Sequence, residues 1–265
     1  MANAILRAAA LADLGSPEGI DAVAEQFLGW ATQDGRGIGQ QTLSVILATQ
    51  VRRRATAADD TPLRPGDVMT EAAATYQQRK PTAAGNGALM RTAAVAITCL
   101  TDRRELARRA RAVSALTHAH PDASDSAVLW TEAIRLAAVE ERIDVEAGLD
   151  LVPEERRGAW RHWIAQAVNH EPAEFNPNGW TVTALQAACS AIAHTPEGPT
   201  QYEEGIQAAI RIGNDTDTVA AIAGGLLGAR WGVDAVPRTW RETVHGWPGW
   251  TCDELGRAAL VAARL

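Results

Sequence analysis

Cysteine is scarce in this chain, and its few copies form no disulfide or metal-binding pattern. Cys99, Cys189 and Cys252 are widely separated, and none belongs to a Cys-x-x-Cys pair. A disulfide framework needs an even set of cysteines, and a structural zinc site needs paired thiols. We therefore expect buried thiols and a reducing compartment.

Long apolar runs and basic patches are also missing. No stretch reaches the ~18 apolar residues of a membrane-spanning helix. Residues 1–14 are alanine-rich, but they lack the basic start and the cleavage site of a signal peptide. The formal net charge is -7 and no basic stripe is present, which disfavours nucleic acid as the main partner. We expect a cytoplasmic protein that binds neither membranes nor nucleic acid.

The alternation typical of β-strands is nearly absent, whereas helical spacing recurs along the chain. Ser16 and Pro17 favour a helix start, and apolar residues then repeat every three or four positions over 20–28. Asp102 with Glu105 resembles a capping box ahead of another helix. Further helices are predicted, to within a few residues, over 4–14, 40–52, 68–78, 88–99, 103–116, 123–140, 154–168, 181–194, 203–211 and 216–231. The sequence therefore predicts an all-α fold.

The chain has no long linker, internal repeat or low-complexity block, so we expect a single domain over residues 1–265. The segment Val233–Trp250 contains prolines and tryptophans, and we expect it to wrap the surface. In the last predicted helix, Gly224, Gly225 and Gly228 would allow close packing against a neighbouring helix.

An acidic motif, Gly213–Thr218, precedes this last helix of small and apolar residues. Asp215, Asp217 and Thr218 place two carboxylates and a hydroxyl at the helix start. The ordinary explanation is a helix cap, for which Asp and Thr are good residues. The alternative is a cation site, because Mg²⁺ and Mn²⁺ prefer oxygen ligands and a buried carboxylate is costly without a partner.

A second motif combines glycine and asparagine at the start of the helix predicted over 88–99. Gly85, Asn86 and Gly87 tolerate backbone conformations that other residues avoid. Backbone N–H groups at a helix start favour anionic groups such as pyrophosphate. An ordinary turn and cap explains the same residues.

A third motif contains two histidines in a loop, His118 and His120, followed by Pro121. No cysteine or third histidine lies nearby, so a zinc site is disfavoured. Either one histidine packs while the other is exposed, or the pair contacts a sugar hydroxyl.

Taken in order, three segments resemble the ADP-ribosylglycohydrolase family, which includes the dinitrogenase reductase-activating glycohydrolases. They are Gly85–Arg91, Thr117–Pro121, and Gly213–Thr218 with the helix behind it. Gly35–Gly39 and Asn178–Trp180 agree more weakly. The order and spacing fit over nearly the whole chain.

The resemblance implies a multi-helix orthogonal bundle with a cleft that holds two Mg²⁺ or Mn²⁺ ions. It implies hydrolysis of the glycosidic bond that links ADP-ribose to a protein side chain or a small acceptor. Carried over by position, Asp215, Asp217 and Thr218 would be metal ligands. The other two motifs would contact ADP-ribose through Gly85, Asn86, Gly87 and His118. No catalytic residue follows from these matches.

The match departs from the family at the N-terminus. Family members normally open with Gly-Asp-Ala-x-Gly and then Thr-Asp-Asp-Thr, which supply the other metal ligands and an acidic residue near the scissile bond. Residues 1–6 align best with the helix after those motifs, so we expect a shortened domain and an incomplete two-ion site, completed by water. Asp59-Asp60-Thr61 looks similar, but Pro62-Leu63-Arg64-Pro65 follows it, and we interpret it as a loop.

Three functions stay open at this point. The ordered motifs favour an ADP-ribosyl hydrolase, and the missing N-terminal ligands favour a pseudoenzyme that binds ADP-ribose without turnover. A purely structural role is the third, since a fold does not fix a function. The retained Asp215, Asp217 and Thr218 argue against it, because a structural protein need not keep three ligand-type side chains together.

Overall fold

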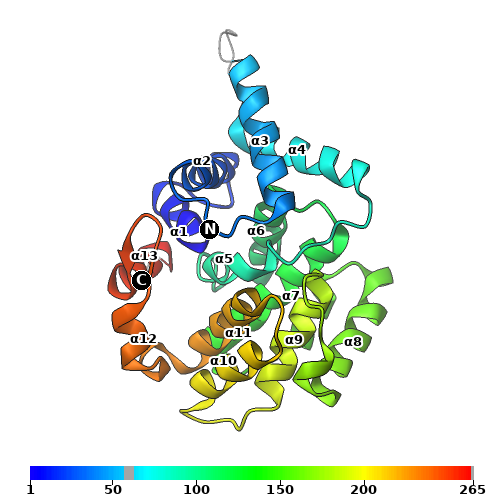
Figure 1. Cartoon of the computed structure of the whole chain (residues 1–265), viewed down its shortest axis with the longest axis vertical. Helices are drawn as coiled ribbons and strands as arrows, with labels where there is room; N and C mark the ends of the chain where they lie inside the picture. The colour runs from blue at the N-terminus through cyan, green and yellow to red at the C-terminus, as the bar shows by residue number, and fades with distance from the viewer. Residues whose placement is uncertain (57–62, 264–265) are drawn as a thin grey trace.

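Helices make up most of the chain in the computed structural model, which describes residues 1–56 and 63–263 (Figure 1). The α-helices are α1 (Ala2–Leu11), α2 (Pro17–Gln33), α3 (Gln40–Ala55), α4 (Pro65–Arg79), α5 (Ala93–Ala96), α6 (Arg103–Ala115), α7 (Pro121–Glu140), α8 (Glu154–Asn169), α9 (Thr181–Ala193), α10 (Gln201–Arg211), α11 (Thr216–Trp231), α12 (Arg238–Thr243) and α13 (Cys252–Ala263). Short 3-10 helices are η1 (Leu89–Arg91), η2 (Glu146–Leu151), η3 (Pro172–Glu174) and η4 (Val233–Ala235). The segment Asp59-Asp60-Thr61 lies outside the described residues. None of the helices described is long and apolar enough to cross a membrane.

Two helix starts follow the capping signals in the sequence. The Ser16 hydroxyl accepts a hydrogen bond from the backbone N–H of Gly19 at the start of α2. The Asp102 carboxylate accepts from the backbone N–H groups of Arg104 and Glu105 at the start of α6. Each cap satisfies backbone donors that have no partner within the helix, so both predicted starts are confirmed.

The helix predicted over 88–99 is wrong. The chain forms η1, a break at Thr92, and then the single turn of α5. The Thr92 hydroxyl donates to the Leu89 carbonyl at 2.8 Å, in competition with the regular backbone ladder. Arg91, the last residue of η1, donates to the Gly87 carbonyl of the preceding loop.

The segment after α11 has more structure than its sequence suggested. It contains η4, α12 and a two-stranded antiparallel hairpin, in which β1 (His245–Gly246) pairs with β2 (Trp250–Thr251). The last helix, α13, was not predicted, although Thr251 and Glu254 form reciprocal hydrogen bonds at its start. Figure 1 shows α13 beside α1, and the two helices pack together.

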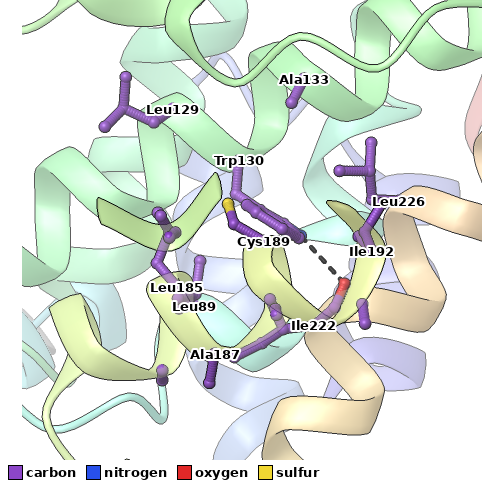
Figure 2. Packing of buried hydrophobic residues seen from close by; sticks show 14 of the residues in the cluster. Leu89, Leu129, Trp130, Ala133, Leu185, Ala187, Cys189, Ile192, Ile222 and Leu226 are labelled. Carbon is purple, nitrogen blue, oxygen red and sulfur yellow. Dashed lines mark hydrogen bonds between the residues drawn. The ribbon is translucent and has the colours of Figure 1, made fainter. Parts of the chain in front are cut away.

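The hydrophobic core consists of two clusters. One is centred on α7, α9 and α11, and the other on α1, α2 and α6. In the first cluster, shown in Figure 2, the buried Trp130 indole donates to the Ile222 carbonyl at 3.0 Å. This bond satisfies the one polar group of a side chain whose truncation would cost about 3–5 kcal/mol.

Two glycines let α11 lie close to its neighbours. A Cβ at Gly225 would lie 2.8 Å from the Ala93 Cβ of α5, and one at Gly224 would lie 3.0 Å from Ile206 Cδ1 of α10. The contact at Gly225 is closer than real Cβ atoms come, and the contact at Gly224 is tight enough that the Ile206 side chain would have to shift. At Gly228 the nearest atom would be 3.7 Å away, an ordinary contact, so close packing requires only the first two glycines.

A buried carboxylate joins α6 to α7. Glu132 is 1% exposed and accepts from Arg103 at 3.0 Å and from Arg135 at 2.8 Å. Arg103 also forms an ion pair with Asp150, with 2.7 Å between Nη2 and Oδ1. Because Glu132 is held by two arginines, its burial does not leave an unpaired charge.

The thiols are only partly as expected. Cys189 is buried, and burial raises the pKa of its thiol. Cys99 and Cys252 are partly exposed, so the expectation of buried thiols is wrong for two of three. Both lie at element ends, where neighbouring helices cannot cover them: Cys99 after α5 and Cys252 at the start of α13.

Candidate functional site

One cavity of about 600 Å³ collects residues from all three motifs. The loop before η1, the loop between α6 and α7, and the N-terminus of α11 converge on it, although they lie far apart in the sequence. The seven residues singled out from the sequence all line it: Gly85, Asn86, Gly87, His118, Asp215, Asp217 and Thr218. A volume of this size is typical of a small-molecule site.

The remaining walls come from the N-terminal helices and the C-terminal hairpin. The cavity is lined by Trp30 of α2, by Asp34 directly after this helix and by the segment 36–42. Trp247, between β1 and β2, lines it as well. Sequence reasoning missed Trp30, Asp34 and Trp247. Only the weak Gly35–Gly39 match pointed to this wall, and no local pattern links the hairpin to it. The hairpin is held in place because Asn3 donates to the Trp247 carbonyl at 2.8 Å.

The turn before α11 aims its first carboxylate at the second motif. Gly213 (φ +88°) and Asn214 (φ +57°) adopt left-handed conformations, which Gly and Asn tolerate best. Asp215 then occupies the N-cap position, yet its side chain makes no capping hydrogen bond. It accepts instead from Asn86 Nδ2 at 2.7 Å. The plain helix-cap interpretation of Asp215 is therefore wrong.

The two other oxygen side chains of this motif differ in burial. Asp217 is exposed, whereas Thr218 is 4% exposed and its hydroxyl lies 3.9 Å from the Met90 sulfur. Among the described residues, no lysine, arginine or histidine forms an ion pair with Asp215 or Asp217. The carboxylates therefore add uncompensated negative charge to this side of the cavity.

The acidic motif offers oxygen donors of the kind that a hard cation prefers. Asp215, Asp217 and Thr218 offer two carboxylates and a hydroxyl, and Mg²⁺ readily keeps water as its remaining ligands. Within residues 1–56 and 63–263, no three His, Cys, Asp or Glu side chains gather as a metal-binding group.

His118 presents a neutral donor to the cavity. It is 3% exposed, and its Nδ1 lies 2.7 Å from the Thr117 hydroxyl. That hydroxyl also accepts from Arg91 Nη2 at 2.8 Å, and Thr117 is 0% exposed. Among the described residues, His118 Nδ1 is the acceptor within reach of its proton, so the hydroxyl donates to Nδ1. The ring proton is consequently on Nε2. Burial, with a smaller contribution from the nearby Arg91 charge, lowers the pKa of His118 to about 3.

The glycines of the second motif make room for this imidazole. A Cβ at Gly87 would lie 3.1 Å from His118 Cε1 and 3.3 Å from Nε2, and one at Gly85 would lie 3.5 Å from Nε2. The ring therefore packs against bare backbone. His120 has a different task, because its Nδ1 accepts from the Asp122 N–H at the start of α7.

Arg91 forms hydrogen bonds to the glycine motif and to the histidine motif. It is 1% exposed and donates to the Gly87 carbonyl at 3.0 Å, the Val113 carbonyl at 3.1 Å and the Thr117 hydroxyl. Its guanidinium lies 4.9 Å from the Phe27 ring centroid, and Nε has no partner among the described residues. Burial lowers its pKa to about 9. No carboxylate of the described residues pairs with it, so it places positive charge beneath the glycine loop.

A second cavity, of about 630 Å³, contains none of the motif residues. Trp130, Cys189, Ile192 and Leu226, seen together in Figure 2, form part of its wall. The residues of the three motifs therefore lie at the first cavity.

Comparison with known proteins agrees with this arrangement. The family profile described as ADP-ribosylglycohydrolase matches residues 1–264. The chain belongs to the ADP-ribosylglycohydrolase family. Its all-α architecture is that of the family, because a solved structure described as an ADP-ribosylglycohydrolase-related protein complex superposes with a TM-score of 0.68 at 25% identity, covering 99% of this chain and 80% of that chain.

Curated relatives in the family match part of the chain. Human ADP-ribosylhydrolase ARH3 is 26% identical over 198 residues, which is 62% of this chain and 54% of that protein. The ADP-ribosylarginine hydrolase Tri1 of Pseudomonas putida (strain GB-1) is 29% identical over 167 residues, which is 62% of this chain and 43% of that protein. The matched region thus spans about half the length of these relatives.

Proposed function

We propose that the protein hydrolyses the glycosidic bond linking ADP-ribose to a protein side chain or a small acceptor. The observation that carries the proposal is the convergence of the three motifs on one cavity, with two carboxylates that have no cationic partner there. Family membership and the names of the relatives from human and Pseudomonas putida support the same reaction class.

The residues divide the work by chemistry. Gly85, Asn86 and Gly87, with the Nε2–H of His118, present polar groups to ADP-ribose at one side of the cavity. Because its pKa is far below neutral, His118 stays a hydrogen-bond donor and is unsuited to proton transfer.

Asp215, Asp217 and Thr218 would hold Mg²⁺ or Mn²⁺ at the other side. When bound, such a cation orients ribose hydroxyls and makes a nearby water a better nucleophile. The carboxylates also stabilise the positive charge that develops on the sugar as the glycosidic bond breaks. We assign no general acid or base.

The alternative is a pseudoenzyme that binds ADP-ribose without turnover. The specific observation in its favour is the donor set, which lacks a third clustered carboxylate among the described residues. Binding through the glycine loop and His118 would survive this loss, whereas a two-ion reaction would not.

Calorimetry and turnover separate these functions. We expect ADP-ribose to bind, Mn²⁺ to raise the melting temperature, and an ADP-ribosylated arginine substrate to be hydrolysed. Binding without hydrolysis of this or any other ADP-ribosylated acceptor would favour the pseudoenzyme, and no binding would reject both. Asp215→Ala should abolish the Mn²⁺-dependent rise. Asp253→Ala, at an exposed carboxylate in the first turn of α13, is the control and should keep it. An unchanged Mn²⁺ response in Asp215→Ala would discard the metal assignment.

A further inference from the structure

Asn178 forms hydrogen bonds to two segments of the site, the glycine loop around Asn86 and the acidic turn before α11. It lies in the loop between η3 and α9, is 0% exposed, and is absent from the cavity wall. Its Oδ1 accepts from the Asp215 N–H at 3.0 Å, and its Nδ2 donates to the Gly213 carbonyl at 3.1 Å. The side chain therefore holds the acidic turn by both of its polar atoms.

The main chain of the same residue holds the glycine loop. The Asn178 carbonyl accepts from Asn86 Nδ2 at 3.0 Å, and the next carbonyl, of Gly179, accepts from the Asn86 N–H at 3.2 Å. The Asn86 Nδ2 donates its second proton to Asp215 at 2.7 Å. Because both amide protons are committed, the orientation of the Asn86 amide is fixed, and its Oδ1 is left as an acceptor.

We propose that Asn178 is a positioning residue of the site, which sets the Asp215 carboxylate and the Asn86 amide without touching the ligand. That the positioned groups bind a ligand rests on the proposed function, whereas the hydrogen bonds of Asn178 do not depend on it. An N-cap N–H such as that of Asp215 normally has no partner within its helix. Here it is bonded to a fully buried side chain, so the turn cannot rotate without breaking a buried hydrogen bond.

Asn176 provides a matched control in the same loop. Its Nδ2 donates to the Ile212 carbonyl at 2.9 Å and its Oδ1 accepts from Asn214 Nδ2. It ties the loop to the acidic turn as Asn178 does, yet it touches neither Asn86 nor Asp215. Asn176 is exposed whereas Asn178 is buried, so Asn176→Ala controls for the loss of a bond between this loop and the acidic turn, and thermal unfolding of both variants controls for the loss of a buried side chain.

The first test is hydrogen exchange of the Asp215 amide, which needs no ligand. In the unaltered protein and in Asn176→Ala we expect this amide to be protected. In Asn178→Ala we expect protection to fall by about tenfold or more, because the acceptor is gone. An Asp215 amide that exchanges without protection in the unaltered protein would overturn the proposal, whatever happens to the variants.

The second test is ADP-ribose binding by calorimetry. Asn178→Ala should raise the Kd by about tenfold, and Asn176→Ala should leave it within about twofold. If Asn178→Ala does not fold, Asn178→Asp keeps the shape and the acceptor but places an oxygen against the Gly213 carbonyl, and it should raise the Kd as well. An unchanged Kd in a folded Asn178 variant, or an equal rise in Asn176→Ala, would refute positioning. If the unaltered protein binds no ADP-ribose, the proposed function fails while the exchange test still decides the geometry.

Discussion

Removing the imidazole of His118 should change how stability depends on pH. The pKa of His118 is about 3 in the folded protein and 6.5 for an ordinary histidine. Between these values the unfolded chain carries one more proton than the folded protein, so folding loses stability as the pH falls. The contribution is fully present above pH 6.5 and is lost progressively toward pH 3.

The magnitude follows from one proton. The free energy of unfolding should fall by about 1.4 kcal/mol per pH unit on account of this group, or about 2 kcal/mol between pH 6.5 and 5. Urea unfolding at several pH values should therefore give a shallower pH dependence for His118→Gln than for the unaltered protein, even though the substitution lowers stability at pH 7.

An exposed histidine serves as the control. His162→Gln removes an imidazole from the surface of α8 and should keep the full pH dependence. In NMR spectra of the unaltered protein, the ring of His118 should stay in the neutral Nε2–H form down to about pH 5. Equal slopes for His118→Gln and the unaltered protein, or a ring that titrates near pH 6.5, would refute the burial argument.

Further substitutions test packing and the site. By urea unfolding, Gly225→Ala should lower stability by about 1–3 kcal/mol, whereas Gly228→Ala should raise it by up to about 1 kcal/mol; the same sign for both would contradict the packing of α11. Glu132→Gln should cost about 3 kcal/mol by thermal unfolding, because two arginines lose their shared charge, and a loss below about 1 kcal/mol would contradict this. In calorimetry, Gly87→Ala should weaken ADP-ribose binding more than Gly85→Ala, since its methyl would press against the imidazole; the reverse order would count against that contact.

Local chemistry explains which helices could be predicted. Ser16 and Asp102 mark helix starts because their caps involve residues two or three positions away. The start of α13 carried a signal of the same kind in Thr251 and Glu254, and it was missed because the segment was judged by its prolines and tryptophans. The break at Thr92 has no such signal, since it depends on packing around η1 and Arg91.

The motif residues of the site could be predicted because their chemistry is compact in sequence. Asp215, Asp217 and Thr218 stand together, and so do the glycines around Asn86. The contribution of Trp247 to the cavity wall and the hydrogen bonds of Asn178 could not be derived in the same way. Their contacts join residues 35 to 244 positions apart, and no periodicity or spacing encodes such pairs.

The cavity carries two charged groups, Arg91 and Asp215, that form no ion pair with another described residue. Arg91 is solvated by carbonyls, a hydroxyl and an aromatic ring, so its positive charge stays uncompensated beneath the glycine loop. Asp215 is held by an amide rather than by a cation, so its negative charge stays uncompensated at α11. Arg91 is buried and Asp215 is partly buried, and a buried charge without a counter-ion costs stability. A ligand that brings an anionic group together with a cation would offset both charges, and the proposed pair of ADP-ribose and a divalent ion is of this kind.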